Sequence, residues 1–140
     1  MISVSRFIVL SALAFACGGT VTSNDSPGTV GDEQPLTATV EAFSGRPNPT
    51  WTLTIEEVKE VRLRTKDLTA TTEPEDFPKL GEAAYTIENN GKVPSLPDRI
   101  VAGRNKVGLT SKSKTSWFVD DKQLGSMLTQ SARAAGALPQ

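Results

Sequence analysis

The strongest constraint on the fold is a pair of alternating apolar runs separated by a proline-containing loop. In LTATVEAF, residues 36–43, apolar and polar side chains alternate, and TWTLT, residues 50–54, places Trp51 and Leu53 on one face. This period of two is typical of half-buried β-strands. The ordered part of the chain is therefore expected to begin with two strands that are joined by a wide turn.

A helix is predicted immediately after the second strand, over residues 55–68 (IEEVKEVRLRTKDL). Thr54 stands at the N-cap position and Glu57 follows three residues later, which is the spacing of a capping box. Helical periodicity predicts that one apolar stripe faces the core. The residues of that stripe are Ile55, Val58, Val61 and Leu68.

The middle of the chain reads as a series of short strands. AAYTIENNGKV contains a strand that runs into an Asn90-Gly91 turn, a strong hairpin signal. The return segment, residues 92–97, holds two prolines and can at best form an edge strand or an extended arm. Three further strand-like runs follow, namely RIVAG, KVGLT and TSWFV.

A second helix is predicted over residues 121–136, with Asp120 or Asp121 as its N-terminal cap and Gly136 as its stop. Gly125 weakens this helix by roughly 1 kcal/mol relative to alanine. The side chains expected to face inward are Leu124, Met127, Leu128, Ser131 and Ala135.

These elements predict an α+β fold. Two strands and a helix are followed by several strands and a helix, in simplest form β-β-α-β-β-β-α. Because βαβ units do not alternate along the chain, we expect a small antiparallel sheet with both helices packed on one face. Residues 36–140 are of a length typical of a single domain.

The N-terminus has the features of an export signal. Residues 1–16 carry one charge, Arg6, followed by an apolar run that is too short to span a bilayer. The segment Leu13 to Cys17 resembles the lipobox of bacterial lipoproteins. The resemblance implies that residues 1–16 are a lipoprotein signal peptide and that Cys17 is lipidated, for example with palmitate, and anchors the protein in the membrane. An ordinary secreted protein with an unpaired thiol is the alternative.

The lipidated cysteine is expected to begin a flexible tether, so that residues 17–35 form one segment. From Gly18 on, this segment is rich in Gly, Ser, Thr, Asp and Pro, and such a composition buries too little apolar surface to fold. Eighteen flexible residues reach about 25 Å. Gly18, in place of aspartate after the cysteine, favours the outer membrane by analogy with lipoprotein sorting.

Composition excludes most small-enzyme chemistry. The chain has no histidine and its single cysteine is assigned to the lipid, so imidazole bases, Cys-His pairs and His- or Cys-ligated zinc are not available. We expect no cofactor, no metal and no enzymatic activity. Carboxylate catalysis remains as an alternative, because Glu73, Glu75 and Asp76 lie close together, although acids in such a loop are usually solvated.

Charge is balanced overall but not locally. The net charge is −1, which does not favour nucleic acid as a partner. Between Asp98 and Asp120 there is no acid but there are five bases, which could form an anion-facing patch or an ordinary solvated face. These bases are Arg99, Arg104, Lys106, Lys112 and Lys114.

The loop between the first two strands, FSGRPNPTW, is the candidate binding segment. Its glycine and prolines restrict the backbone, so Arg46 and Asn48, with the adjacent Trp51, could recognise an anionic ligand or an envelope protein at low entropic cost. The alternative, which we favour, is that the loop is a structural anchor. The stretch resembles the phenylalanine-Gly-Arg-Pro-Asn-Pro-x-Trp core shared by a family of small uncharacterised proteins, and the resemblance implies no activity.

The functional expectation is a lipid-anchored cell-envelope protein whose domain is a non-enzymatic binding or structural module. One alternative is a carboxylate-dependent hydrolase of envelope polysaccharide. Another is an inhibitor of an envelope enzyme, with the rigid loop as a plug.

Overall fold

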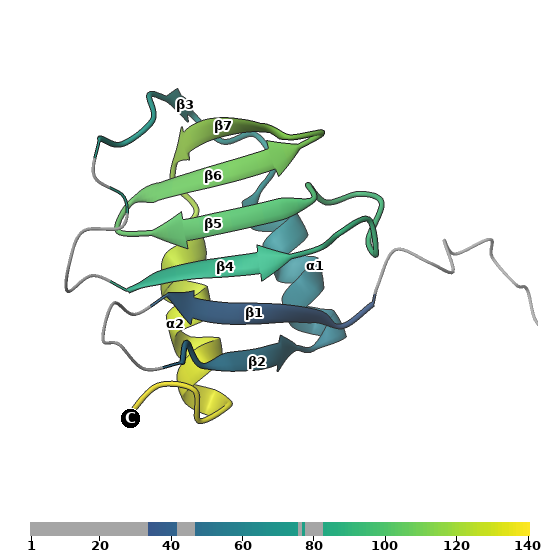
Figure 1. Ribbon diagram of the computed structural model, residues 1–140, viewed down its shortest axis with the longest axis vertical. Coiled ribbons are helices and arrows are strands. Elements are labelled where there is room, and N and C mark those ends of the chain that lie inside the picture. Colours follow the sequence, from purple (N-terminus) through teal and green to yellow (C-terminus); the bar gives the residue numbers. More distant parts are fainter. Residues whose placement is uncertain (1–33, 42–46, 76, 78–82) are drawn as a thin grey trace, which may run out of the picture.

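The computed structural model describes residues 34–41, 47–75, 77 and 83–140 (Figure 1). Cys17 and Arg46 lie outside these ranges, as do the predicted signal peptide and nearly all of the predicted tether. The elements are β1 (Leu36–Glu41), β2 (Thr50–Leu53), α1 (Ile55–Arg64), β3 (Ala70–Thr71), β4 (Ala84–Glu88), β5 (Arg99–Gly103), β6 (Lys106–Ser111), β7 (Lys114–Val119) and α2 (Leu124–Ala134).

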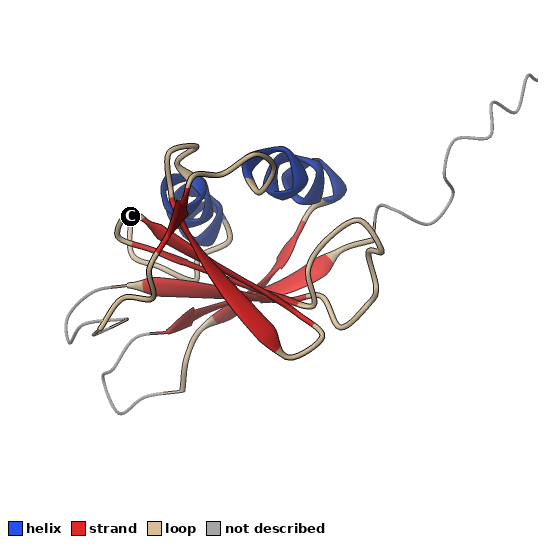
Figure 2. Cartoon of the chain, turned by 90° about the horizontal axis from the view of Figure 1, so that it is seen from above, coloured by secondary structure: helices blue, strands red, loops and turns tan. Residues whose placement is uncertain are grey.

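The strands form one antiparallel sheet in the order β2-β1-β4-β5-β6-β7-β3. Figure 2 shows both helices on the same face of this sheet. The predicted α+β class and the one-sided packing of the helices are therefore confirmed. Five strands follow α1 instead of the three in the simplest predicted order. One of the five, β3, has only two residues and leaves no periodic pattern in the sequence.

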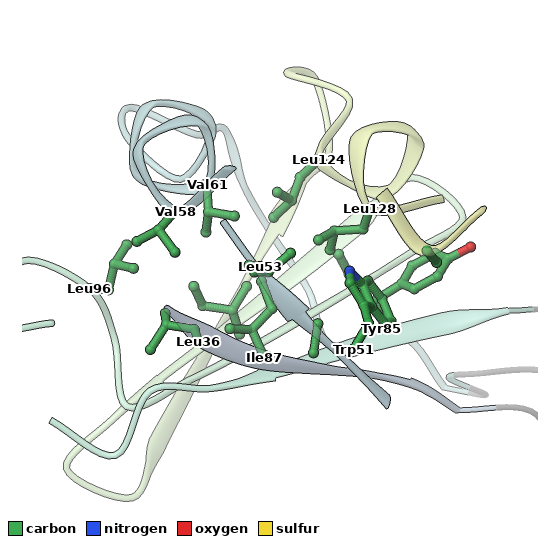
Figure 3. Packing of buried hydrophobic residues seen from close by; sticks show 14 of the residues in the cluster. Leu36, Trp51, Leu53, Val58, Val61, Tyr85, Ile87, Leu96, Leu124 and Leu128 are labelled. Carbon is green, nitrogen blue, oxygen red and sulfur yellow. The ribbon is translucent and has the colours of Figure 1, made fainter. Parts of the chain in front are cut away.

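Alternation along the strands sorts side chains between the two faces of the sheet. Leu36, Ala38 and Val40 of β1 are fully buried toward the helices, whereas Thr37 on the other face is exposed. Figure 3 shows the resulting core between the sheet and the helices. Its largest fully buried hydrophobic side chains are Leu36, Leu53, Ile87, Ile100, Leu124, Leu128, Val40, Val58, Val61, Val93 and Val107.

The helix α1 has the predicted start but a shorter length. Thr54 Oγ1 accepts a hydrogen bond from the Glu57 amide at 3.2 Å, and Glu57 Oε2 accepts one from the Thr54 amide at 2.8 Å, which completes the capping box. The helix ends at Arg64 with Thr65 as its C-cap, and it cannot extend to residue 68 because Asp67 has a left-handed φ of 51°.

Two of the inward positions predicted for α1 need correction. Ile55, the first residue of the helix, is 38% exposed, while Val58 and Val61 are buried as predicted. Leu68 does pack against the core, but from the segment after the helix.

The helix α2 is also shorter than predicted, and its N-cap position is Gln123, with a left-handed φ of 57° and no capping bond from its side chain. Asp120, three residues earlier, nevertheless takes the predicted capping role. Asp120 Oδ1 accepts a hydrogen bond from the Leu124 amide at 2.6 Å, and Oδ2 accepts one from the Gly125 amide at 2.8 Å. Gly136, with φ 75°, follows the helix end as predicted. Ala135 is exposed and Ala132 is buried, so the predicted inward position of Ala135 is wrong.

Residues 92–97 form turns and not an edge strand. Asn90 and Gly91 make the predicted turn, with φ values of 47° and 76°, but β4 pairs with β5, which starts only at Arg99. The connection is held by the buried Asn89, whose side chain bonds to the backbone of Val93. Because an internal side chain satisfies the loop backbone, no strand pairing is needed there.

Candidate binding site

Three connections of the chain begin or end at one end of the sheet, which we call the loop end. Glu41 pairs with Ala84, Ala84 pairs with Gly103, and Gly103 pairs with Lys106. The last residue of β1, the first residue of β4 and the turn between β5 and β6 therefore lie at the same end of the sheet, on the left in Figure 1. Loops held by a rigid scaffold are where binding residues concentrate.

The predicted binding segment is one of these connections. The Val40 amide donates a hydrogen bond to the Pro49 carbonyl oxygen at 2.9 Å, which ties the end of the segment to β1. Asn48 is exposed. Arg46 lies outside the described residues, so its role as binding residue or anchor stays a prediction.

Trp51 belongs to the core and not to an accessible surface. Its side chain is 7% exposed, and its Nε1 donates a hydrogen bond to Ser131 Oγ at 2.8 Å. Its ring also meets Tyr85 edge-on, with centroids 6.2 Å apart. These contacts fit the structural interpretation of Trp51, and Trp51 lines neither of the two hollows described below.

The five bases between Asp98 and Asp120 do not form one patch. Arg104 and Lys106 lie at the loop end, whereas Lys112 and Lys114 lie at the opposite end of β6, about 17 Å away at the usual strand rise. Arg99 pairs with Glu41 at 3.3 Å and with Glu88 at 3.1 Å. A continuous anion-facing patch of all five bases is therefore ruled out by the strand register.

The loop end contains a polar cavity of about 230 Å³, which we call the end pocket. It lies between the sheet and the first turns of α2, and sequence reasoning missed it. Its walls combine one cation, one carboxylate and three hydroxyl groups. The lining residues are Ala83, Tyr85, Gly103, Arg104, Asp120, Gly125, Ser126 and Thr129.

The hydrogen bonds of the pocket wall fix the direction of the Tyr85 hydroxyl. Thr129 Oγ1 donates its single proton to the Gly125 carbonyl oxygen at 2.8 Å. In the 2.7 Å contact between Tyr85 and Thr129 the tyrosine must therefore be the donor. The Tyr85 oxygen is left as an acceptor, and Figure 3 shows it directed away from the hydrophobic cluster.

The two carboxylate oxygens of Asp120 can accept further hydrogen bonds in the end pocket. Each carboxylate oxygen accepts one amide proton from the start of α2, and each has about two lone-pair sites. The carboxylate is fixed in position by these two bonds. A Cβ atom on Gly125 would lie 3.3 Å from Asp120 Oδ2, so glycine at that position leaves room beside the carboxylate.

Arg104 also lines the end pocket and carries a charge opposite in sign to that of Asp120. It occupies the turn between β5 and β6 with a left-handed φ of 52°, a conformation uncommon for a residue with a side chain. The two-residue turn between the paired residues Gly103 and Lys106 accounts for this conformation. The end pocket thus contains charges of both signs.

A second hollow, of about 320 Å³, lies between α1 and α2. Two of its glutamates already have roles in α1, since Glu57 completes the capping box and Glu60 pairs with Arg64 at 3.3 Å. It is lined by Glu56, Glu57, Glu60, Met127, Gln130, Ser131 and Ala134.

Glu73 and Glu75, two of the carboxylates considered for catalysis, line neither of these cavities. Glu73 and Glu75 are exposed, and Asp76 lies outside the described residues. Across the described ranges, no cluster of three or more potential metal-ligating His, Cys, Asp or Glu side chains occurs.

No family model, curated protein or solved structure matches this chain.

Proposed function

We propose that this chain is a lipid-anchored cell-envelope protein, in the outer membrane, whose α+β domain is a non-enzymatic binding module. The anchor rests on the lipobox-like segment that ends at Cys17 and on the tether-like composition of residues 18–35. In the part of the chain that the structure describes, there is no helix with the length and apolar character needed to cross a membrane.

The end pocket is the observation that supports the binding function best. It gathers polar side chains from β4, the β5–β6 turn, Asp120 and α2 at the loop end of the sheet. The sheet and helices behind it form a closely packed core, which holds these groups in place before a ligand arrives. Such preorganisation lowers the entropic cost of binding.

The chemistry of the pocket favours binding over catalysis. Asp120, the carboxylate in its wall, already accepts two backbone hydrogen bonds that start α2. Carboxylate catalysis of glycoside cleavage needs a pair of acids facing the substrate, and among the described residues that line the pocket Asp120 is the single acid. The expected partner is an envelope component and not nucleic acid.

The lipid anchor is tested with Cys17→Ala in the full chain, expressed in a bacterium that processes lipoproteins. We expect this variant to lose both membrane association and labelling by a palmitate analogue, while Ser23→Ala in the predicted tether keeps both. Membrane fractionation and gel fluorescence provide the readouts. An unlabelled wild type, or a Cys17→Ala protein that stays with the membrane, contradicts the proposal.

The binding function is tested by co-sedimentation of the Cys17→Ser chain with washed cell envelopes. We expect saturable binding that is lost in Ser126→Trp, because position 126 is exposed and lines the end pocket. Ser95→Trp is the matched control, since Ser95 is exposed in the connection at the opposite end. Equal binding by both variants argues against the end pocket as the site.

A further inference from the structure

We propose that the end pocket binds a small zwitterion, with the ammonium group of the ligand at Asp120 and Tyr85 and its anionic group on the Arg104 side. This inference rests on the proposed binding function and gives its ligand class. It follows from the direction of the hydrogen bonds in the pocket wall and from the opposite charges of Asp120 and Arg104.

The hydrogen-bond acceptors in the pocket wall favour an ammonium group in the ligand. The Tyr85 hydroxyl has already donated its proton to Thr129, and both Asp120 oxygens can accept only. Three acceptor atoms therefore line the pocket, and an ammonium group has three N–H donors and no acceptor. Because one acceptor is ionised, a hydrogen bond to it is roughly twice as strong as a neutral one.

Burial strengthens this preference. Tyr85 is 3% exposed, and its ring edge contacts the buried Trp51. An acceptor held in such a setting is oriented by the core and cannot turn away to follow another partner. A ligand group without N–H or O–H donors would remove water from these acceptors without replacing its hydrogen bonds, which is unfavourable.

The anionic group of the ligand is inferred from Arg104. A bare cation in the pocket would be repelled by this guanidinium, and a bare anion would be repelled by Asp120. Arg104 also has an interaction within the protein, and a guanidinium has five N–H donors with which it can hold more than one partner. A ligand with both charges meets an opposite charge at each wall, and discrimination by repulsion excludes the singly charged analogues.

The volume limits the size of the ligand. At about 230 Å³ the end pocket is smaller than the roughly 300–1,000 Å³ of sites for drug-sized molecules. It suits a single amino acid or a phosphoethanolamine group. Both sources supply an ammonium group close to an anion, one as a carboxylate and the other as a phosphate.

The test is an NMR titration of the isotopically labelled Cys17→Ser chain. The probes are glycine, D-alanine and phosphoethanolamine as zwitterions, methylamine and acetate as single charges, and glucose as a neutral polyol. We expect at least one zwitterion to shift the Leu124 and Gly125 amide signals saturably. Methylamine and acetate should bind at least roughly tenfold more weakly, since each loses one charge-assisted hydrogen-bonded contact.

Two variants locate the ammonium group. Asp120→Asn should weaken zwitterion binding roughly tenfold or more by removing the charge, and Tyr85→Phe should weaken it several-fold by removing one acceptor. Asp121→Asn is the matched control, because Asp121 is exposed, accepts a hydrogen bond from Thr69, and does not line the pocket. The relative affinity of amino acids and phosphoethanolamine identifies the source.

Several results would overturn the inference. Acetate that binds as tightly as the zwitterions indicates an anion site, and saturable shifts with glucose alone indicate a polyol site. Undiminished zwitterion binding in Asp120→Asn, or no shift with any zwitterion, also contradicts it. If Asp120→Asn fails to fold, Tyr85→Phe and the wild-type ligand series decide. Co-sedimentation with envelopes that persists without zwitterion binding refutes the ligand class but leaves the binding function standing.

Discussion

At the scale of single residues, Trp51 shows how one side chain can look like a recognition element and be a structural one. It was a binding candidate because it flanks a stiff loop, yet its indole nitrogen bonds to Ser131 in α2, 80 residues away. The sequence predicts correctly that Trp51 lies on the apolar face of β2, but it does not show which helix covers that face. Long-range partners of this kind depend on the whole fold.

We expect Trp51→Ala to lower the free energy of unfolding by about 3–5 kcal/mol, because it removes a large buried ring and leaves a cavity. The Ser131 hydroxyl also loses its donor. Denaturant melts of the Cys17→Ser chain measure the effect. Leu63→Ala is the control, since Leu63 is 59% exposed and should change stability by no more than about 0.5 kcal/mol. Similar values for the two variants would refute the anchoring role of Trp51.

Gly125 is the second residue where local and tertiary effects oppose each other. Alanine in a helix interior is favoured over glycine by about 1 kcal/mol, so Gly125→Ala should stabilise α2 on propensity alone. Its Cβ would, however, press on Asp120 Oδ2 at 3.3 Å, and Asp120 is held by two hydrogen bonds. We therefore expect no gain in the melting temperature, whereas Ser126→Ala, one position on, should gain slightly. A clear stabilisation by Gly125→Ala would show that Asp120 can move.

At the scale of elements, the connection from β4 to β5 is organised by one buried amide. Asn89 is fully buried, and its Nδ2 donates to the carbonyl oxygens of Val93, Leu96 and Pro97 at 2.9–3.1 Å. Its Oδ1 accepts from the Val93 amide at 2.7 Å. The Asn90-Gly91 turn was predictable because it is local chemistry, but the loop that follows was not, since it is held by a side chain in its interior.

We expect Asn89→Ala to destabilise the protein by about 3 kcal/mol or more, because several backbone groups of the loop lose their partner at once. The control is Asn90→Gly at the adjacent position. Asn90 is exposed with φ 47°, a conformation that glycine adopts freely, so this change should be neutral or slightly stabilising. Chemical denaturation of both variants provides the comparison. A neutral Asn89→Ala would mean that water replaces the amide without cost.

At the scale of the whole molecule, periodic patterns in the sequence predicted most helices and strands. The end pocket, in contrast, depends on the register in which the strands pair. The one-sided packing of the helices was predictable, because strands with one apolar face need a cover. The end pocket was not, because Tyr85, Arg104 and Asp120 are far apart in the sequence and have no shared motif. They meet only because β4 pairs with β5 and because α2 starts beside them. Helix ends were missed where a tertiary contact or a left-handed residue overrode propensity.

The boundary of the folded domain gives the last expectation. The strand β1 pairs with β2 on one side and β4 on the other, and Leu36, Ala38 and Val40 are fully buried, so the fold needs the chain from about residue 36 on. The composition of residues 18–35 predicts that they contribute nothing to stability.

Brief proteolysis of the Cys17→Ser chain should therefore leave a resistant fragment that begins near Leu36. Deletion of residues 18–30 should leave the denaturant midpoint unchanged, whereas deletion through residue 40 should abolish cooperative unfolding, because two strand pairings lose their common partner. Protection of residues 18–35 from protease, or a lower midpoint after the shorter deletion, would show that this segment is part of the domain.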